Sequence, residues 1–323
     1  MSTEPSFVIE LPEGSLAIHD LTVGAADPGV PVVLAVHGIT ANGLSFRELA
    51  EELHRRHGPG AVRVLAPDLR GRAASRDAPG PYGLAAHVAD LATVVGAFGA
   101  QPVLVGHSMG GFITALAAAE HPRLVRAAVL VDGGLAFPPP PDLDVDAALA
   151  AVIGPAMDRL SMRFDDEAAH LEFWQQHPAV GPVLRTGAAG ESVRRYLDHD
   201  LVPAPDTPGA LMSSCILEAV RADGRDVLVS EDAHSAAARA VAAGVPVELV
   251  WARRGLLDEP QGLYDEGRLA ALDLPAELVV RGVDANHYDV ILSGEGLTAV
   301  VDAIDRGLAA EEPAERTLDA QNR

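Results

Sequence analysis

Residues 103–112 read "VLVGHSMGGF", and this stretch decides the fold. The apolar run 103–105 predicts a buried strand, and the alanine-rich run from Phe112 to His121 predicts a helix. Between them, Gly106, Ser108 and Gly110 fit the G-x-S-x-G pattern of a nucleophile elbow. In such a turn the serine adopts a strained backbone conformation, and the flanking glycines avoid collisions in a cramped bend. We therefore expect a nucleophilic serine beside the positive end of the helix that follows.

Strands and helices alternate on both sides of this stretch. Apolar runs typical of buried strands occupy residues 31–38, 62–68, 125–134, 245–252 and 277–283, after an opening hairpin at 6–23. Helical patterns occupy residues 44–58, 83–99, 112–121, 230–244 and 296–309. This alternation with short connections predicts an α/β protein with a mostly parallel sheet covered by helices on both faces.

The alternation stops at the proline-rich "FPPPPD" of residues 137–142. The next ninety or so residues contain no convincing buried strand and instead hold helical patterns, for example 165–177 and 190–201. We therefore predict a core formed by residues 1–136 and 227–312. A helical insertion occupies residues 137–226, and a polar tail occupies residues 313–323.

Composition excludes several classes of function. The chain has 323 residues, a net charge of −22 and no lysine, so a P-loop lysine, a Schiff base and a lysine nucleophile are excluded. The acidic surface argues against nucleic-acid partners. No apolar stretch predicts a membrane span or a signal peptide, and the single cysteine, Cys215, rules out an intramolecular disulfide. We expect a cytoplasmic protein with a small-molecule substrate; the oligomeric state stays open.

A serine hydroxyl needs a base, and a base needs an orienting carboxylate. Among twelve histidines, His287 follows the last strand and so lies at the carboxyl edge of the sheet, beside the elbow. For the acid we favour Asp258, the first carboxylate after strand 245–252. Asp132, at the end of strand 125–134, is the rival.

An acyl-transfer site also needs two donors for the oxyanion. The backbone N–H groups of Ile39, in "VHGIT", and of Met109 are the predicted pair, and His37 is expected to hold this loop. Predicted substrate contacts come from residues beside these donors and from aromatic residues of the insertion: Thr40, His107, Phe164, Trp174 and Tyr196.

In their order, the segments "AVHGIT", "APDLRGRAAS", "VLVGHSMGGF", "AAVLVDGG", "VPVELVWARRGLLDE" and "ANHYDVIL" resemble the landmarks of the α/β-hydrolase superfamily. The resemblance implies an eight-stranded, mostly parallel sheet with a helical cap inserted after the sixth strand. Ser108, Asp258 and His287 follow the superfamily's triad order. One departure is Ala73, where members commonly carry glycine.

These observations predict a serine esterase or lactonase that acts on a small, largely apolar substrate through an acyl-enzyme. Thioester and carbon–carbon bond hydrolysis use the same triad and stay open. A non-catalytic small-molecule receptor on the same scaffold is the alternative from another class. We expect no cofactor and no metal, because the sequence has no H-E-x-x-H motif and no paired Cys/His cluster.

Overall fold

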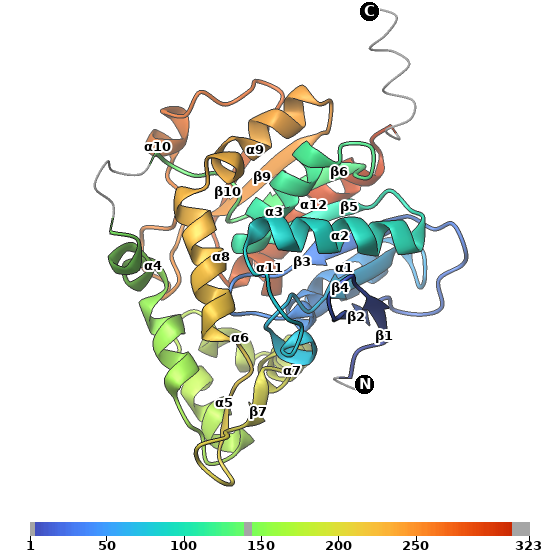
Figure 1. Cartoon of the computed structure of the whole chain (residues 1–323). Helices are drawn as coiled ribbons and strands as arrows, with labels where there is room; N and C mark the ends of the chain where they lie inside the picture. Colours follow the sequence, from blue (N-terminus) through green and yellow to red (C-terminus); the bar gives the residue numbers. More distant parts are fainter. Residues whose placement is uncertain (1–3, 139–143, 312–323) are drawn as a thin grey trace, which may run out of the picture.

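The computed structural model describes residues 4–138 and 144–311 (Figure 1). Eight strands form one sheet in the order β1-β2-β4-β3-β5-β6-β9-β10. Their bounds are β1 (Phe7–Glu10), β2 (Ser15–Asp20), β3 (Val32–Val36), β4 (Arg63–Pro67), β5 (Val103–His107), β6 (Ala127–Val131), β9 (Val247–Ala252) and β10 (Val279–Val283). The eight-stranded, mostly parallel sheet predicted from the sequence is confirmed.

The directions of the paired strands show at which edge of the sheet the predicted serine and histidine lie. β1 and β2 are antiparallel to their neighbours, whereas the strands from β4 to β10 in the sheet order run parallel. In β5 every residue is buried, because helices cover both faces of the sheet. The carboxyl ends of the parallel strands consequently meet at one edge, where the loops after β3, β5, β6 and β10 come together.

Helices form a layer on each face (Figure 1). One core contains the buried side of α2 (Leu84–Phe98), α3 (Met109–Glu120) and α9 (Glu231–Ala242). The other contains α1 (Arg47–His57) and α12 (Gly294–Leu308). Alternate residues of β3 separate between the two cores, with Leu34 in the first and Val33 in the second. Among the described residues, no helix has both the length and the apolar composition required to cross a membrane.

Between β6 and α9 the chain leaves the sheet and forms a mainly helical segment, shown in green and yellow in Figure 1. It holds α4 (Val145–Ser161), α5 (Glu167–Gln175), α6 (Gly181–Leu184), α7 (Gly187–Asp198) and α8 (Leu217–Val229). A short hairpin, β7 (Leu201–Pro203) and β8 (Leu211–Ser213), was not anticipated. The predicted boundary at residue 226 falls inside α8, and the predicted tail lies outside the described residues.

The remaining elements are short connections near the sheet edges. They are two 3₁₀ helices, η1 (Gly43–Phe46) and η2 (Ala73–Ser75), and the helices α10 (Glu266–Ala270) and α11 (Asp289–Leu292). In η2, Ala73 has a φ of 41°, so this alanine occupies the left-handed region that favours glycine. Its N–H donates to the Ser214 hydroxyl (2.8 Å), a contact with the helical segment that helps to hold this backbone.

Candidate active site

Ser108 lies at the turn between β5 and α3 with φ 56° and ψ −122°. This positive φ is the strained conformation that the elbow motif predicts. The glycines are required by space: a Cβ at Gly106 would lie 2.0 Å from the Gly110 carbonyl oxygen, and a Cβ at Gly110 would lie 2.0 Å from that of Val36. The sequence therefore packs β3, β5 and α3 so closely that only glycine fits on either side of the serine.

His287 follows β10, as predicted, but its carboxylate partner is Asp132 and not Asp258. The Nδ1 of His287 lies 2.6 Å from Oδ2 of Asp132, which is fully buried at the end of β6. The other carboxylate oxygen accepts a hydrogen bond from the Ala252 N–H (3.0 Å). With its proton on Nδ1, His287 leaves Nε2 as a hydrogen-bond acceptor.

Asp258 belongs to a different interaction. Its side chain is 40% exposed and accepts a hydrogen bond from Nε of Arg254 (2.7 Å). Arg254 also pairs with Asp284, and the hydrogen bond from Arg254 lowers the pKa of Asp258. The assignment of Asp258 as the partner of His287 is therefore wrong, because the loop after β9 turns this carboxylate toward an arginine.

One signal in the sequence could have favoured Asp132. It is followed by Gly133, and a Cβ at that glycine would lie 2.0 Å from the Ser108 carbonyl oxygen. An Asp-Gly pair at the end of the strand next to the elbow thus marks close approach to the serine. Tyr264 holds the chain just beyond it, donating its hydroxyl to the Leu135 carbonyl (2.7 Å) and accepting from the Leu135 N–H (3.2 Å).

The loop after β3 passes directly beside the serine, since a Cβ at Gly38 would lie 3.2 Å from Cβ of Ser108. His37 fixes this loop. Its Nε2 accepts from the Leu69 N–H (2.9 Å), so Nδ1 carries the proton that it donates to the Gly38 carbonyl (2.7 Å). Burial lowers the pKa of His37 to about 3, which keeps the ring neutral.

Because the Gly38 carbonyl points toward His37, the N–H of the same peptide, which belongs to Ile39, points the other way. Within the described part of the chain, neither the Ile39 nor the Met109 N–H has a protein acceptor. Two backbone donors near Ser108 are thus available to a ligand, as the sequence predicts for an oxyanion site.

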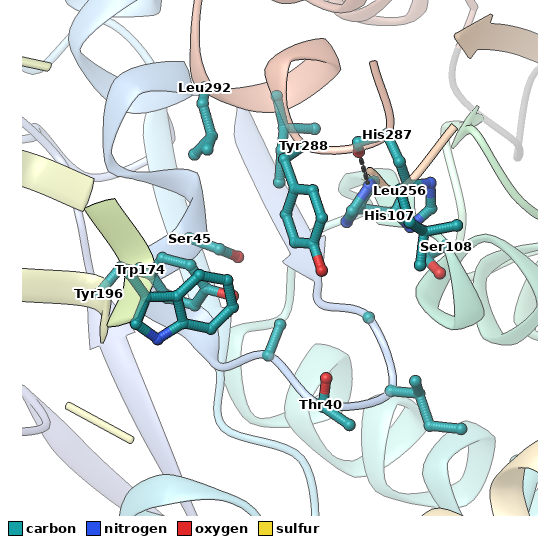
Figure 2. A pocket seen from close by; sticks show the side chains of 14 residues that line it. Thr40, Ser45, His107, Ser108, Trp174, Tyr196, Leu256, His287, Tyr288 and Leu292 are labelled. Carbon is teal, nitrogen blue, oxygen red and sulfur yellow. Dashed lines mark hydrogen bonds between the residues drawn. The ribbon is translucent and has the colours of Figure 1, made fainter. Parts of the chain in front are cut away.

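Ser108 and His287 both line a small cavity of about 50 Å³ (Figure 2). We call it the histidine-side cavity. Four of the five predicted substrate-contact residues line it: Thr40, His107, Trp174 and Tyr196. The fifth, Phe164, does not line it and packs against His170 and Phe173 instead. Tyr288, which the sequence analysis missed, also faces this cavity (Figure 2).

The ring of His107 contacts the backbone carbonyl of His287. Its Nε2 lies 2.8 Å from the His287 carbonyl oxygen, and the two ring centroids are 4.6 Å apart. Burial lowers the pKa of His107 well below its usual range, so the neutral ring donates this hydrogen bond. The role of His107 visible in the structure is therefore to hold the loop that carries His287.

Ser108 also lines a larger cavity of about 420 Å³, which we call the apolar chamber. Its walls come from the elbow, the loop after β6, α8 and the loop before α10. Its apolar lining residues include Ile39, Met109, Phe112, Leu135, Val227 and Leu263. Ser108 thus lines two cavities that differ in size.

Two buried arginines contact the loop that carries Ile39. Arg72 donates from Nε and Nη2 to the Ile39 carbonyl (3.1 and 3.0 Å), and Arg159 donates from Nη2 to the Thr40 carbonyl (3.2 Å). Burial alone would lower the pKa of Arg159, but the neighbouring Asp200 carboxylate raises it overall, so the guanidinium stays charged. Nothing in the sequence analysis anticipated either arginine.

Within the residues that the structure describes, one cluster has the composition of a metal site: His19, Asp68 and His199, whose ligand atoms lie within 4.8 Å of one another. Oδ2 of Asp68 lies 3.0 Å from Nε2 of His19 and 2.8 Å from Nε2 of His199. Burial alone would raise the pKa of Asp68, but these hydrogen bonds lower it overall. The cluster therefore links β2 and the end of β4 to the helical segment beyond α7.

Comparison with known proteins identifies the family and agrees with the fold. The model of the family described as alpha/beta hydrolase fold matches residues 31–293. Lipase LipV of Mycobacterium tuberculosis (strain ATCC 25618 / H37Rv) is 37% identical over 122 residues, which are 37% of this chain and 44% of that protein. The chain thus spans less than half the length of this relative.

Two solved structures are similar over nearly the whole chain. The hypothetical protein PA1622 from Pseudomonas aeruginosa PAO1 has a TM-score of 0.67 at 22% identity, covering 94% of this chain and 99% of that one. E-2-(Acetamidomethylene)succinate hydrolase has a TM-score of 0.63 at 25% identity, covering 90% and 95%. The first likeness concerns the fold alone.

Proposed function

The chain belongs to the alpha/beta hydrolase family, and we propose that it is a serine hydrolase that cleaves a carboxylic ester or lactone of a small, largely apolar substrate. The observation that carries the proposal is the buried Asp132–His287 hydrogen bond of 2.6 Å beside Ser108, whose φ is 56°. A strained serine and an oriented imidazole on one cavity are two of the parts that acyl transfer requires.

In the first half of the reaction, Oγ of Ser108 forms a bond to the substrate carbonyl carbon while His287 Nε2 takes the hydroxyl proton. The N–H groups of Ile39 and Met109 bind the oxyanion of the tetrahedral intermediate. His287 then gives the proton to the leaving oxygen as the carbon–oxygen bond breaks. Asp132 keeps the ring in the required tautomer and stabilises the imidazolium.

In the second half, water attacks the acyl-enzyme and gives its proton to His287. The bond between Ser108 and the acyl carbon breaks as His287 returns the proton to Oγ. The products are a carboxylic acid and the free serine, and each step balances without a further reagent.

The two cavities divide the substrate between them. The leaving oxygen must lie near His287 to receive its proton, so the leaving group occupies the histidine-side cavity of about 50 Å³. The acyl group extends away from His287 into the apolar chamber of about 420 Å³. This arrangement favours a large apolar acyl group and a small leaving group.

The names of the relatives support hydrolysis as the reaction class, since one is named a lipase and one a hydrolase. A lipase name fits an apolar acyl chain, and the chamber offers the surface to bind one. Burial of apolar surface stabilises binding by about 0.8 kcal/mol per methylene. We therefore expect kcat/KM to increase roughly fourfold for each added methylene until the chamber is full.

The test compares wild type with Ser108→Ala on short and long acyl esters, lactones and thioesters, and with a fluorophosphonate probe. Wild type is expected to take up one label per chain and to hydrolyse esters, and Ser108→Ala to lose the label and at least about 10⁴-fold in kcat. Equal labelling of both proteins, or tight binding of the panel without hydrolysis, would refute the proposal.

A further inference from the structure

Two consecutive carbonyl groups of the loop beside Ser108 each accept hydrogen bonds from a buried guanidinium. The Ile39 carbonyl accepts two from Arg72, and the Thr40 carbonyl accepts one from Arg159. Arg72 is fully buried and Arg159 is 3% exposed. Ile39 is also the residue whose N–H is the proposed oxyanion donor, so both arginines act within one residue of that donor.

Each guanidinium is neutralised by one buried aspartate. Nη1 of Arg72 lies 2.6 Å from Oδ2 of Asp223, and Nη1 of Arg159 lies 2.5 Å from Oδ2 of Asp200. Hydrogen bonds to ionised groups are shorter and stronger than those between neutral groups. A buried charge that loses its partner is strongly destabilised, so each pair holds its arginine in place.

The aspartates are themselves fixed by further donors. Asp223 accepts from the Gly83 N–H (2.8 Å) and from Nε2 of His87 (3.1 Å). Asp200 accepts from the hydroxyls of Ser213 (3.0 Å) and Ser214 (2.8 Å). Hydrogen bonds to both oxygens restrict the rotation of each carboxylate. Each carboxylate in turn restricts the arginine that it binds.

Most of this network comes from the helical segment between β6 and α9. Asp223 lies on α8, Arg159 lies on α4, and Asp200 follows α7. Arg72 comes from the loop after β4 and joins Asp223 to the Ile39 carbonyl. The helical segment is therefore connected to both carbonyls of the loop by continuous chains of charged hydrogen bonds.

We propose that Arg72 and Arg159 are positioning residues for the oxyanion site, and that the helical segment sets the geometry of this site through them. The inference rests on the proposed acyl-transfer function. The hydrogen bonds from Arg72 and Arg159 to these two carbonyls fix the planes of the Ile39–Thr40 and Thr40–Ala41 peptides. With the Gly38 carbonyl held by His37, three consecutive peptides of the turn are held by hydrogen bonds. A donor that rotates away from the oxyanion weakens the transition state more than the bound substrate.

The test uses Arg72→Lys, which keeps a positive charge opposite Asp223 but loses the paired donation to Ile39. Wild type, Arg72→Lys and the control are compared by kcat and KM on one ester, and by the affinity for a trifluoromethyl ketone with the same acyl chain. The matched control is His199→Leu, which removes a different link between the helical segment and the core, the hydrogen bond to Asp68 (2.8 Å).

Arg72→Lys is expected to reduce kcat by about ten- to a hundredfold, below the effect of deleting a whole oxyanion donor. We expect KM to change by less than about twofold and the ketone to bind more weakly by the same factor as kcat falls. The control is expected to keep wild-type kcat even if its melting temperature falls. A loss in kcat at unchanged KM in Arg72→Lys, together with an unchanged kcat in the control, distinguishes a positioning role from a merely structural one.

A folded Arg72→Lys protein with kcat within twofold of wild type would overturn the inference, as would an equal loss in the control. If Arg72→Lys does not fold, Arg159→Lys tests the Thr40 carbonyl with the same readouts and the same two outcomes. If wild type hydrolyses no ester and Ser108→Ala takes up the same label, the proposed function fails and this inference fails with it. Turnover by wild type together with an unaffected variant refutes the positioning role alone.

Discussion

Replacing Asp132 by Asn distinguishes the two carboxylates that the sequence offers for His287. Oδ1 of Asp132 accepts the Ala252 N–H (3.0 Å), and Oδ2 accepts Nδ1–H of His287 (2.6 Å). In Asp132→Asn the amide oxygen must face Ala252, because two donors would otherwise meet there. The amide NH₂ then faces Nδ1 of His287 and forces the ring proton onto Nε2.

A ring with its proton on Nε2 cannot accept the Ser108 proton. This tautomer change costs about 10⁴-fold in kcat in a serine protease triad, which corresponds to about 5 kcal/mol of transition-state stabilisation. We expect a loss of this order here, because Asp132 is fully buried and no water can replace it as an acceptor. Ground-state binding has no reason to change, so KM should stay within about twofold.

Asp258→Asn is the matched control. Asp258 is a carboxylate with a 40% exposed side chain, and its partner is Arg254, so its loss should change kcat by less than about twofold. The assay is ester hydrolysis at pH 8 together with the rate of fluorophosphonate labelling. If Asp132→Asn stays within tenfold of wild type while Asp258→Asn loses thousands-fold, the assignment of the acid from this structure is wrong.

Two further predictions concern acid stability and the apolar chamber. His37 and His107 are buried and neutral because burial lowers their pKa values, so below the ordinary histidine pKa of about 6.5 the unfolded state binds more protons than the folded state. The free energy of unfolding should therefore decrease as the pH falls, by about 1.4 kcal/mol at pH 5.5 from His37 alone, whose pKa is about 3, and His107 acts in the same direction. Urea denaturation at pH 7.5 and 5.5 measures this difference, and unchanged stability at the lower pH would contradict it. Val227→Phe fills part of the chamber and should lower kcat/KM for a decanoyl ester at least about tenfold while leaving an acetyl ester within about twofold. Leu217→Phe, at a 40% exposed position on the same helix, is the control; equal losses for both esters would argue against the chamber as the acyl site.

Local features of the sequence were sufficient for the sheet and for the serine. The strands β3, β5, β6 and β9 are short, mainly apolar runs because helices cover both faces of the sheet, and this pattern is visible without any tertiary information. The edge strand β10 is partly exposed and carries Arg281. The elbow is also local, since Gly106 and Gly110 are required by contacts within one strand–turn–helix unit and its immediate neighbour. The position of His287 follows from strand order, because the carboxyl ends of parallel strands share one edge.

The choice between Asp132 and Asp258 was not local. Both follow strands that end at the same edge of the sheet. Which of the two binds His287 depends on their other partners: Arg254 donates a hydrogen bond to Asp258, whereas Asp132 is left to accept from His287. The same limit applies to Phe164, an aromatic residue of the helical segment that packs within that segment and does not reach the histidine-side cavity. Residue type narrows the candidates, but orientation depends on contacts between residues far apart in the chain.

By itself, the sequence determined the α/β sheet, the strained serine, and the loops that carry His287, Ile39 and Met109, because periodicity, glycine spacing and strand order are properties of consecutive residues. Only the tertiary structure decided the acid, the two unequal cavities and the buried pairs Arg72–Asp223 and Arg159–Asp200. These features join residues 41 to 155 positions apart, and a charge becomes a fixed hydrogen-bond donor only when packing has removed water and supplied its counter-charge.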